Sequence, residues 1–170
     1  MTTRSTHLLI ERLLSAQISK PACGLEMSLA VARQLAADAE AKAGAMDLPI
    51  VIAVADSEGA PVLFHRMDGS LPASVEIATN KAWTAAAFRM STDELGRLAQ
   101  PGQMLFGVEA SHGGRAVLFG GGMPLWREGK VIGAIGISGG TADEDMIIAA
   151  HALNQFQNLR GLCPEQGAEK

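Results

Sequence analysis

Two apolar runs with glycine-rich ends, both lying between Arg115 and Asp145, constrain the fold more than any other part of the sequence. The runs are Ala116–Phe119 and Val131–Ile137. Their ends are Gly120-Gly121-Gly122 and Ser138-Gly139-Gly140-Thr141. Short apolar runs bounded by glycine are typical of strands, and glycine lets backbone or a flat ligand approach closely because it lacks a Cβ. We therefore predict two strands of one sheet with two glycine-lined edges.

Short polar turns between apolar segments predict that the sheet is antiparallel. The turn Arg127–Lys130 joins a strand over Met123–Trp126 to the second apolar run. Upstream, Asp56–Gly59 separates the apolar segments Pro49–Ala55 and Pro61–Met67. Turns of this length connect adjacent strands in hairpins. Each of the two turns therefore predicts a pair of neighbouring antiparallel strands.

Apolar residues at helical spacing predict the helices that flank these strands. The expected helices are His7–Ile18, Glu26–Ala43, Ala73–Phe88, Ser91–Ala99 and Ala142–Leu159. Helices before, between and after antiparallel strands predict an α+β fold in which the helices pack on the sheet. We expect an N-terminal amphipathic helix and linker over residues 1–23, a main domain over 24–160 and a polar tail over 161–170.

Composition excludes several classes of function. The chain has 170 residues, a net charge of −4 and no Lys/Arg cluster, which argues against nucleic acid as a partner. No apolar run is long enough for a membrane span, and the N-terminus lacks the features of a secretory signal. Cys23 and Cys163 lie far apart without CxxC spacing, so a cytoplasmic protein with reduced thiols is expected.

Four motifs resemble the GlcG/HbpS-like family over Leu25–Phe156. They read VADSEGAPVLFHRMDG, NKAWTAA, FGGGMP and GKVIGAIGISGGTADED in chain order. The family includes the haem-binding protein HbpS and the C-terminal domain of PduO-type adenosyltransferases. The resemblance implies a profilin/PAS-like layout with about five strands, and haem or, less strongly, a corrinoid as ligand. For PduO-type relatives it also implies work inside a bacterial microcompartment.

Lys81 is the most unusual side chain of the predicted helix Ala73–Phe88, because it lies in the centre of the apolar face. A buried ammonium needs a partner. Its stem can pack while its head reaches a carboxylate of the protein or the carbonyls at a helix end. Alternatively, the cation can bind an anionic ligand such as a propionate; a Schiff-base or general-base role is a third alternative. We predict that Lys81, Arg66 and the two glycine edges, Gly120–Gly122 and Ser138–Thr141, border one pocket.

Single histidines are candidates for a haem ligand, although each can also be an ordinary hydrogen-bonded residue. None has the spacing of a zinc site, but a haem iron needs only one or two axial ligands. His112 lies in a glycine-flanked loop before the first glycine edge, and His65 lies in a predicted strand beside apolar neighbours. Ser138 stands in a GxSxG pattern, but His151 lies too far along the final helix to activate it. No catalytic residue is assigned.

These observations predict a protein that binds a small molecule, with haem or another tetrapyrrole such as a corrinoid as the expected ligand. The alternative is an enzyme acting on a small carboxylate or aldehyde, with Lys81 and Arg66 as an anion clamp. Alanine-rich helices with apolar faces predict a homo-oligomer. The first helix either packs on its own domain or a neighbouring subunit, or docks residues 5–18 onto a microcompartment shell. The expected location is therefore the cytoplasm or a microcompartment within it.

Overall fold

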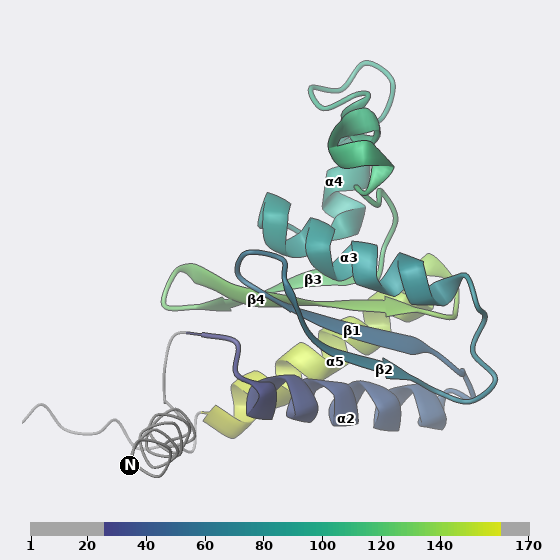
Figure 1. Ribbon diagram of the computed structural model, residues 1–170, viewed down its shortest axis with the longest axis vertical. Helices are drawn as coiled ribbons and strands as arrows, with labels where there is room; N and C mark the ends of the chain where they lie inside the picture. Colours follow the sequence, from purple (N-terminus) through teal and green to yellow (C-terminus); the bar gives the residue numbers. More distant parts are fainter. Residues whose placement is uncertain (1–25, 161–170) are drawn as a thin grey trace, which may run out of the picture.

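Four antiparallel strands form one sheet with helices on both faces (Figure 1). The computed structural model describes residues 26–160, with side chains described for residues 26–157. In the order β2-β1-β4-β3, the strands are β2 Pro61–Arg66, β1 Val51–Asp56, β4 Lys130–Ser138 and β3 Gly122–Arg127. The helices are α2 Leu29–Ala45, α3 Ser74–Phe88, α4 Thr92–Leu98, the short 3₁₀ helix η1 Val108–Gly114 and α5 Ala142–Arg160. The predicted α+β class is confirmed, but the described chain has four strands and not about five.

The two faces of the sheet differ in the size of their side chains. Figure 1 shows α2 and α5 on one face and α3 on the other. The face toward α2 and α5 carries large aliphatic residues, among them Ile52 and Ile135. The face toward α3 carries small residues such as Ala53, which packs near Ala82. Because both faces are covered, the central strand β1 is buried along nearly its whole length, which explains its unbroken apolar sequence.

Small residues bring α3 very close to the sheet. Gly136 of β4 faces α3, and a Cβ at this position would overlap the backbone carbonyl of Ala78 and lie 2.5 Å from the backbone nitrogen of Ala82. A strand glycine of this kind marks a close approach of another backbone. The close contact holds α3 firmly over β4 and so fixes the position of Lys81, which α3 carries.

The starts of α2 and α5 have the side-chain caps that their sequences favour. The Ser28 hydroxyl accepts a hydrogen bond from the backbone N–H of Val31 at 3.3 Å. At the start of α5, the Glu144 backbone N–H donates to the Thr141 hydroxyl at 3.3 Å, and the Glu144 carboxylate accepts from the Thr141 backbone N–H at 2.8 Å. This reciprocal arrangement is a capping box. It fixes the turn between β4 and α5.

The predicted strand Ala116–Phe119 is wrong, because this segment is irregular and the strand begins only at Gly122. The Val117 backbone N–H donates to the Thr84 hydroxyl of α3 at 3.1 Å, which anchors the segment to a helix and not to a neighbouring strand. Gly121 then adopts a φ of 117°, a conformation that no ordinary strand residue takes. Tertiary bonding and a left-handed glycine therefore override the apolar pattern here.

The loop before this segment also differs from expectation. His112 lies in η1, where it adopts a left-handed conformation with φ 52° and ψ 33°. The segment Met104–Val108, whose sequence is compatible with a short strand or a turn, forms turns up to Val108, where η1 begins. In Figure 1, α4 and the chain that follows it project away from the sheet.

Candidate functional site

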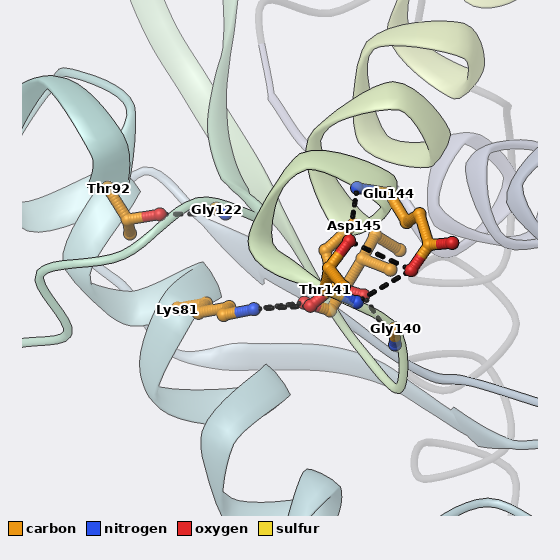
Figure 2. A network of polar contacts seen from close by, with 8 residues as sticks. Lys81, Thr92, Gly122, Gly140, Thr141, Glu144 and Asp145 are labelled. Carbon is orange, nitrogen blue, oxygen red and sulfur yellow. Dashed lines mark hydrogen bonds and ion pairs between the residues drawn. The ribbon is translucent and has the colours of Figure 1, made fainter.

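The ammonium group of Lys81 lies where α3, the end of β4 and the start of α5 meet. Its Nζ atom is 2.7 Å from Asp145 Oδ2 and 2.8 Å from the backbone oxygen of Ile137. The Lys81 side chain is 0% exposed and that of Asp145 is 3% exposed. Figure 2 shows Lys81 pointing from α3 toward the first turn of α5. The cation in the apolar helical face thus finds its carboxylate within the protein.

The capped start of α5 positions the Asp145 carboxylate. Asp145 Oδ1 accepts a hydrogen bond from the backbone N–H of Gly140 at 3.0 Å, while Oδ2 faces Lys81. Burial raises the pKa of the Asp145 carboxyl, and its bonds to Lys81 and to the glycine amides oppose that rise. Burial also lowers the pKa of the Lys81 ammonium, against the attraction of Asp145. Removal from water outweighs the mutual attraction in both groups, as is common for buried ion pairs.

The glycine edges pack against this ion pair. A Cβ at Gly121 would lie 2.6 Å from both Lys81 Nζ and the Ile137 oxygen. A Cβ at Gly120 would lie 2.6 Å from the Met146 side chain, and one at Gly122 would lie 2.5 Å from the Thr92 methyl group. Each missing side chain thus corresponds to space that protein atoms fill. The glycines allow the segment to pass between α3 and α5.

Thr92 fixes the far end of the glycine segment. Its hydroxyl accepts a hydrogen bond from the backbone N–H of Gly122 at 3.0 Å, and Figure 2 shows this contact beside Lys81. Ser91, the N-cap residue of α4, donates to the Asp93 carboxylate at 2.6 Å and makes no capping bond. The Thr92 hydroxyl therefore holds the glycine segment in place and does not cap the helix.

Phe119 covers the ion pair from the outside. Its ring centroid lies 4.8 Å from Lys81 Nζ, a distance at which a cation and an aromatic ring attract each other. The Phe119 side chain is 48% exposed, so it connects the buried pair to the protein surface. The sequence does not single out Phe119, because this residue ends an apolar run whose composition predicts a strand.

The predicted cluster forms only in part. Lys81, Gly120–Gly122 and Ser138–Thr141 come together around Asp145. Arg66 lies on the edge strand β2, where its Nε donates to the Ser70 hydroxyl at 3.2 Å. Arg66 and Ser138 pair with the same residue of β1 from opposite sides, so a strand separates them. The structure gives each cation its own partner within the protein.

His112 joins an aromatic cluster at the end of α3. Its ring lies edge to face with Trp83, at 5.1 Å between centroids, and with Phe88, at 6.3 Å. The guanidinium carbon of Arg115 lies 4.6 Å from the Trp83 ring. An exposed imidazole, two aromatic rings and a cation therefore share one surface region that the sequence did not reveal.

His65 lies elsewhere, on the β2 side facing α2. Its Nε2 atom is 3.6 Å from Glu40 Oε2, and both side chains are about half exposed. The two histidine candidates thus occupy different parts of the protein. Within residues 26–160, no three His, Cys, Asp or Glu side chains converge to hold a metal ion.

Comparison with known proteins assigns the chain to a family. A family model for the haem-degrading protein HbpS-like family matches residues 27–154. The chain belongs to the HbpS-like family. The predicted resemblance is therefore confirmed, and the match covers the sheet, the helices on both faces and the Lys81–Asp145 pair.

Three relatives show how this HbpS-like chain compares with other proteins. An uncharacterized 15.0 kDa protein from the dhaT-dhaS intergenic region of Citrobacter freundii is 42% identical, covering 78% of this chain and 94% of that protein. Corrinoid adenosyltransferase PduO of Citrobacter freundii is 41% identical over 76% of this chain but only 38% of its own length. The crystal structure of a PduOC:heme complex has 40% identity and a TM-score of 0.74, covering 76% of this chain and 94% of that one.

The HbpS-like domain has no helix within residues 26–160 that is long and apolar enough to cross a membrane. The predicted docking segment, residues 5–18, lies outside the described residues.

Proposed function

We propose that this chain binds a small molecule and that the ligand is haem or a closely related tetrapyrrole. One observation carries the proposal: the PduOC:heme complex is 40% identical and matches over 94% of its chain. Corrinoid is the weaker candidate, because it enters through the name of PduO proteins, of which this chain spans only 38% in Citrobacter freundii.

The surface around His112 supports this proposal best. A haem needs an axial ligand, an apolar surface for the macrocycle and cations for its propionates. The exposed His112 imidazole can supply the ligand, Trp83 and Phe88 supply aromatic surface, and Arg115 supplies a cation. His65 is the second candidate ligand, but Glu40 already lies beside its Nε2 atom.

The region around Lys81 is the second candidate surface for the ligand. There the exposed Phe119 ring and the edges Gly120–Gly122 and Ser138–Thr141 would form the contact. Lys81 would act by holding Asp145 and these edges in place, because its ammonium already bonds protein acceptors. Arg66 would contribute from β2 only by releasing Ser70.

The enzyme alternative requires Lys81 and Arg66 to face one small carboxylate or aldehyde. In the structure Lys81 bonds Asp145, while Arg66 bonds Ser70 through two contacts. A clamp would have to break both sets of bonds before it could bind an anion. We therefore propose the binding function ahead of the enzyme.

Partners form a further part of the proposal. Several large apolar side chains are at least half exposed, including Leu71, Met104 and Phe106, and such side chains are often covered in an oligomer. We infer a homo-oligomer on this basis and from the alanine-rich helices. Recruitment to a microcompartment shell through residues 5–18 rests on the sequence of that segment and on the likeness to PduO.

Titration of hemin into the purified full chain tests the proposal. Binding should produce a Soret band that differs in position and sharpness from that of free hemin, and it should saturate at a fixed ratio of haem to protein. The proposal fails if the spectrum remains the sum of free hemin and protein. The same titration with a cobalamin distinguishes haem from corrinoid.

A further inference from the structure

We propose that a second pocket, between the β1–β2 turn, the end of α3 and the β3–β4 hairpin, binds a small planar carboxylate. The hairpin begins β4, and the Lys81–Asp145 site lies at the other end of that strand, beside Ser138. The two sites are thus separated by the length of β4. The planar carboxylate is proposed as a ligand in addition to haem. The pocket adjoins the surface around His112 without sharing a residue with it, because Arg89 follows Phe88 at the end of α3 and Gly59 of the β1–β2 turn lies against the Trp83 ring.

Three segments that are far apart in the sequence form the pocket. Its cavity volume is about 350 Å³, and its lining residues are Ser57, Glu58, Arg89, Trp126, Gly129, Lys130 and Val131. Convergent polar groups in a concave site mark a ligand pocket, and volumes of such pockets run from roughly 300 to 1,000 Å³. A cavity at the small end of this range suits a one-ring or two-ring acid and is too small for a whole tetrapyrrole.

The charges of the lining favour an anion. Arg89 and Lys130 have no ion pair within the described residues, and Glu58 is the single acidic residue of the lining. The lining therefore carries two positive charges and one negative charge, a net charge of +1. A guanidinium offers two parallel donors that match the geometry of a carboxylate.

The backbone of Arg89 is held in an uncommon conformation. Arg89 caps the C-terminus of α3 with φ 56° and ψ 33°, in the left-handed region. Glycine or asparagine is usual at this position, because a residue with a larger side chain is strained there. An arginine at such a position points to a function for its side chain. Arg89 is also one of the residues that line the pocket.

Trp126 supplies a flat apolar surface in the same pocket. Its side chain is 46% exposed, and the pairing of β3 with β4 shifts register between Leu125 and Trp126. A bulge of this kind redirects a side chain. Indole faces stack on planar ligands, so a ring on Trp126 would place its carboxylate within reach of the two cations. The combination of Trp126, Arg89 and Lys130 specifies a planar carboxylate.

The test uses naphthoate as the probe and naphthamide as its uncharged match. Naphthoate should shift the indole N–H signal of Trp126 in the NMR spectrum, which a Trp126→Phe variant assigns, and should leave that of Trp83 in place. Arg89→Gln should weaken naphthoate binding about tenfold or more, because a charged hydrogen bond is lost. Arg33→Gln, which changes an exposed arginine of α2, should leave the affinity unchanged.

A second variant separates binding from stability. Arg89→Gly removes the cation and relieves the left-handed strain, so binding should be lost while the thermal midpoint stays equal or rises. A lower midpoint would show that Arg89 serves the fold and would overturn the proposal. Equal affinity for naphthamide, no shift of the Trp126 signal, or full affinity in Arg89→Gln would each overturn it as well. The haem proposal fails if hemin titration of the unaltered chain gives no bound Soret band, whereas this proposal fails on the naphthoate results alone, so the two fail independently.

Discussion

The Nζ atom of Lys81 lies 2.7 Å from Asp145 Oδ2, and this contact joins α3 to α5 across 64 positions of the sequence. Neither side chain reaches solvent to any extent. Two buried charges of opposite sign offset each other, but either one alone would be left without water or a counter-ion. The pair therefore makes the packing of two helices depend on both residues.

Replacing Lys81 with Met should lower the free energy of unfolding by about 3–5 kcal/mol, because it leaves the Asp145 carboxylate buried and unpaired. The double variant Lys81→Met/Asp145→Asn should recover much of this loss, since the amide carries no charge and can still accept from Gly140. Urea denaturation measures both effects. Lys130→Met, at an exposed lysine that has no ion pair within residues 26–157, should change stability by no more than about 0.5 kcal/mol.

Measuring stability and haem binding of the Lys81→Met variant together decides the role of Lys81. If Lys81→Met keeps full stability but loses haem binding, the lysine contacts the ligand and the ion pair is secondary. If the variant is destabilised while its folded fraction binds haem normally, Lys81 is a structural residue.

The sequence predicted the elements whose pattern is local. The unbroken run Pro49–Ala55 became β1, whose faces are both covered, and the turn Arg127–Lys130 became the β3–β4 hairpin. The period of the apolar residues in Ala73–Phe88 placed Lys81 on the buried side of α3. In each case propensity, periodicity and turn chemistry agree, and such agreement is what makes an element predictable.

The remaining features depend on contacts between distant residues. Ala116–Phe119 has the composition of a strand, but Thr84 of α3 bonds its backbone. The sequence predicted that Lys81 needs a carboxylate partner but did not identify Asp145, which is one of three acidic residues in the first turn of α5. Its spacing held a signal: Asp145, Ala149, Ala152 and Phe156 recur at helical intervals, and all four are buried.

Gly121→Ala should destabilise the protein strongly, by about 2–4 kcal/mol, because φ is 117° and the new Cβ would overlap Lys81 Nζ and the Ile137 oxygen. Gly44→Ala is the matched control. Gly44 lies in α2 with no atom within 4 Å of its missing Cβ, so alanine there should raise stability by up to about 1 kcal/mol. Thermal unfolding of both variants provides the measurement. A neutral Gly121→Ala would mean that the segment can move away from the ion pair.

Glu144→Gln should remove a pH-dependent part of the stability. Hydrogen bonds from the Thr141 backbone N–H and hydroxyl lower the pKa of Glu144 below its ordinary value of 4.5. The folded protein thus binds this proton less readily than the unfolded chain does. The contribution of Glu144 to the free energy of unfolding is therefore fully present above pH 4.5. It is lost as the pH falls through the pKa of Glu144 in the folded protein.

Stability measured from pH 7 downward tests this prediction. The unaltered chain should exceed Glu144→Gln at neutral pH, and the difference should shrink in acid. Glu94→Gln, at an exposed glutamate in the first turn of α4, provides the control. A difference that grows as the pH falls would contradict the assigned direction.

A reporter fused to residues 1–22 should move to a microcompartment shell if residues 5–18 form a docking helix. Leu13 and Leu14 lie on the predicted apolar face, so changing both to Glu should abolish the localisation. Ser15→Glu, on the predicted polar face, should preserve it. Fluorescence microscopy in a host that carries the cognate shell gives the readout. A reporter that stays diffuse in that host would remove the docking hypothesis.

His112→Ala should shift the Soret band of the haem-loaded protein and weaken hemin binding, because the proposed axial imidazole is lost. His65→Ala tests the second candidate in the same way, and His151→Ala on α5 is the matched control that should leave the spectrum unchanged. Thermal unfolding checks that each variant folds, since His112 also packs against Trp83. Adding free imidazole should restore the spectrum of His112→Ala, because a small ligand can occupy the vacated position; loss of a merely structural residue would not be rescued. An unchanged Soret band in His112→Ala, with a shift in His65→Ala, would move the haem site to the face of β2 that Glu40 adjoins.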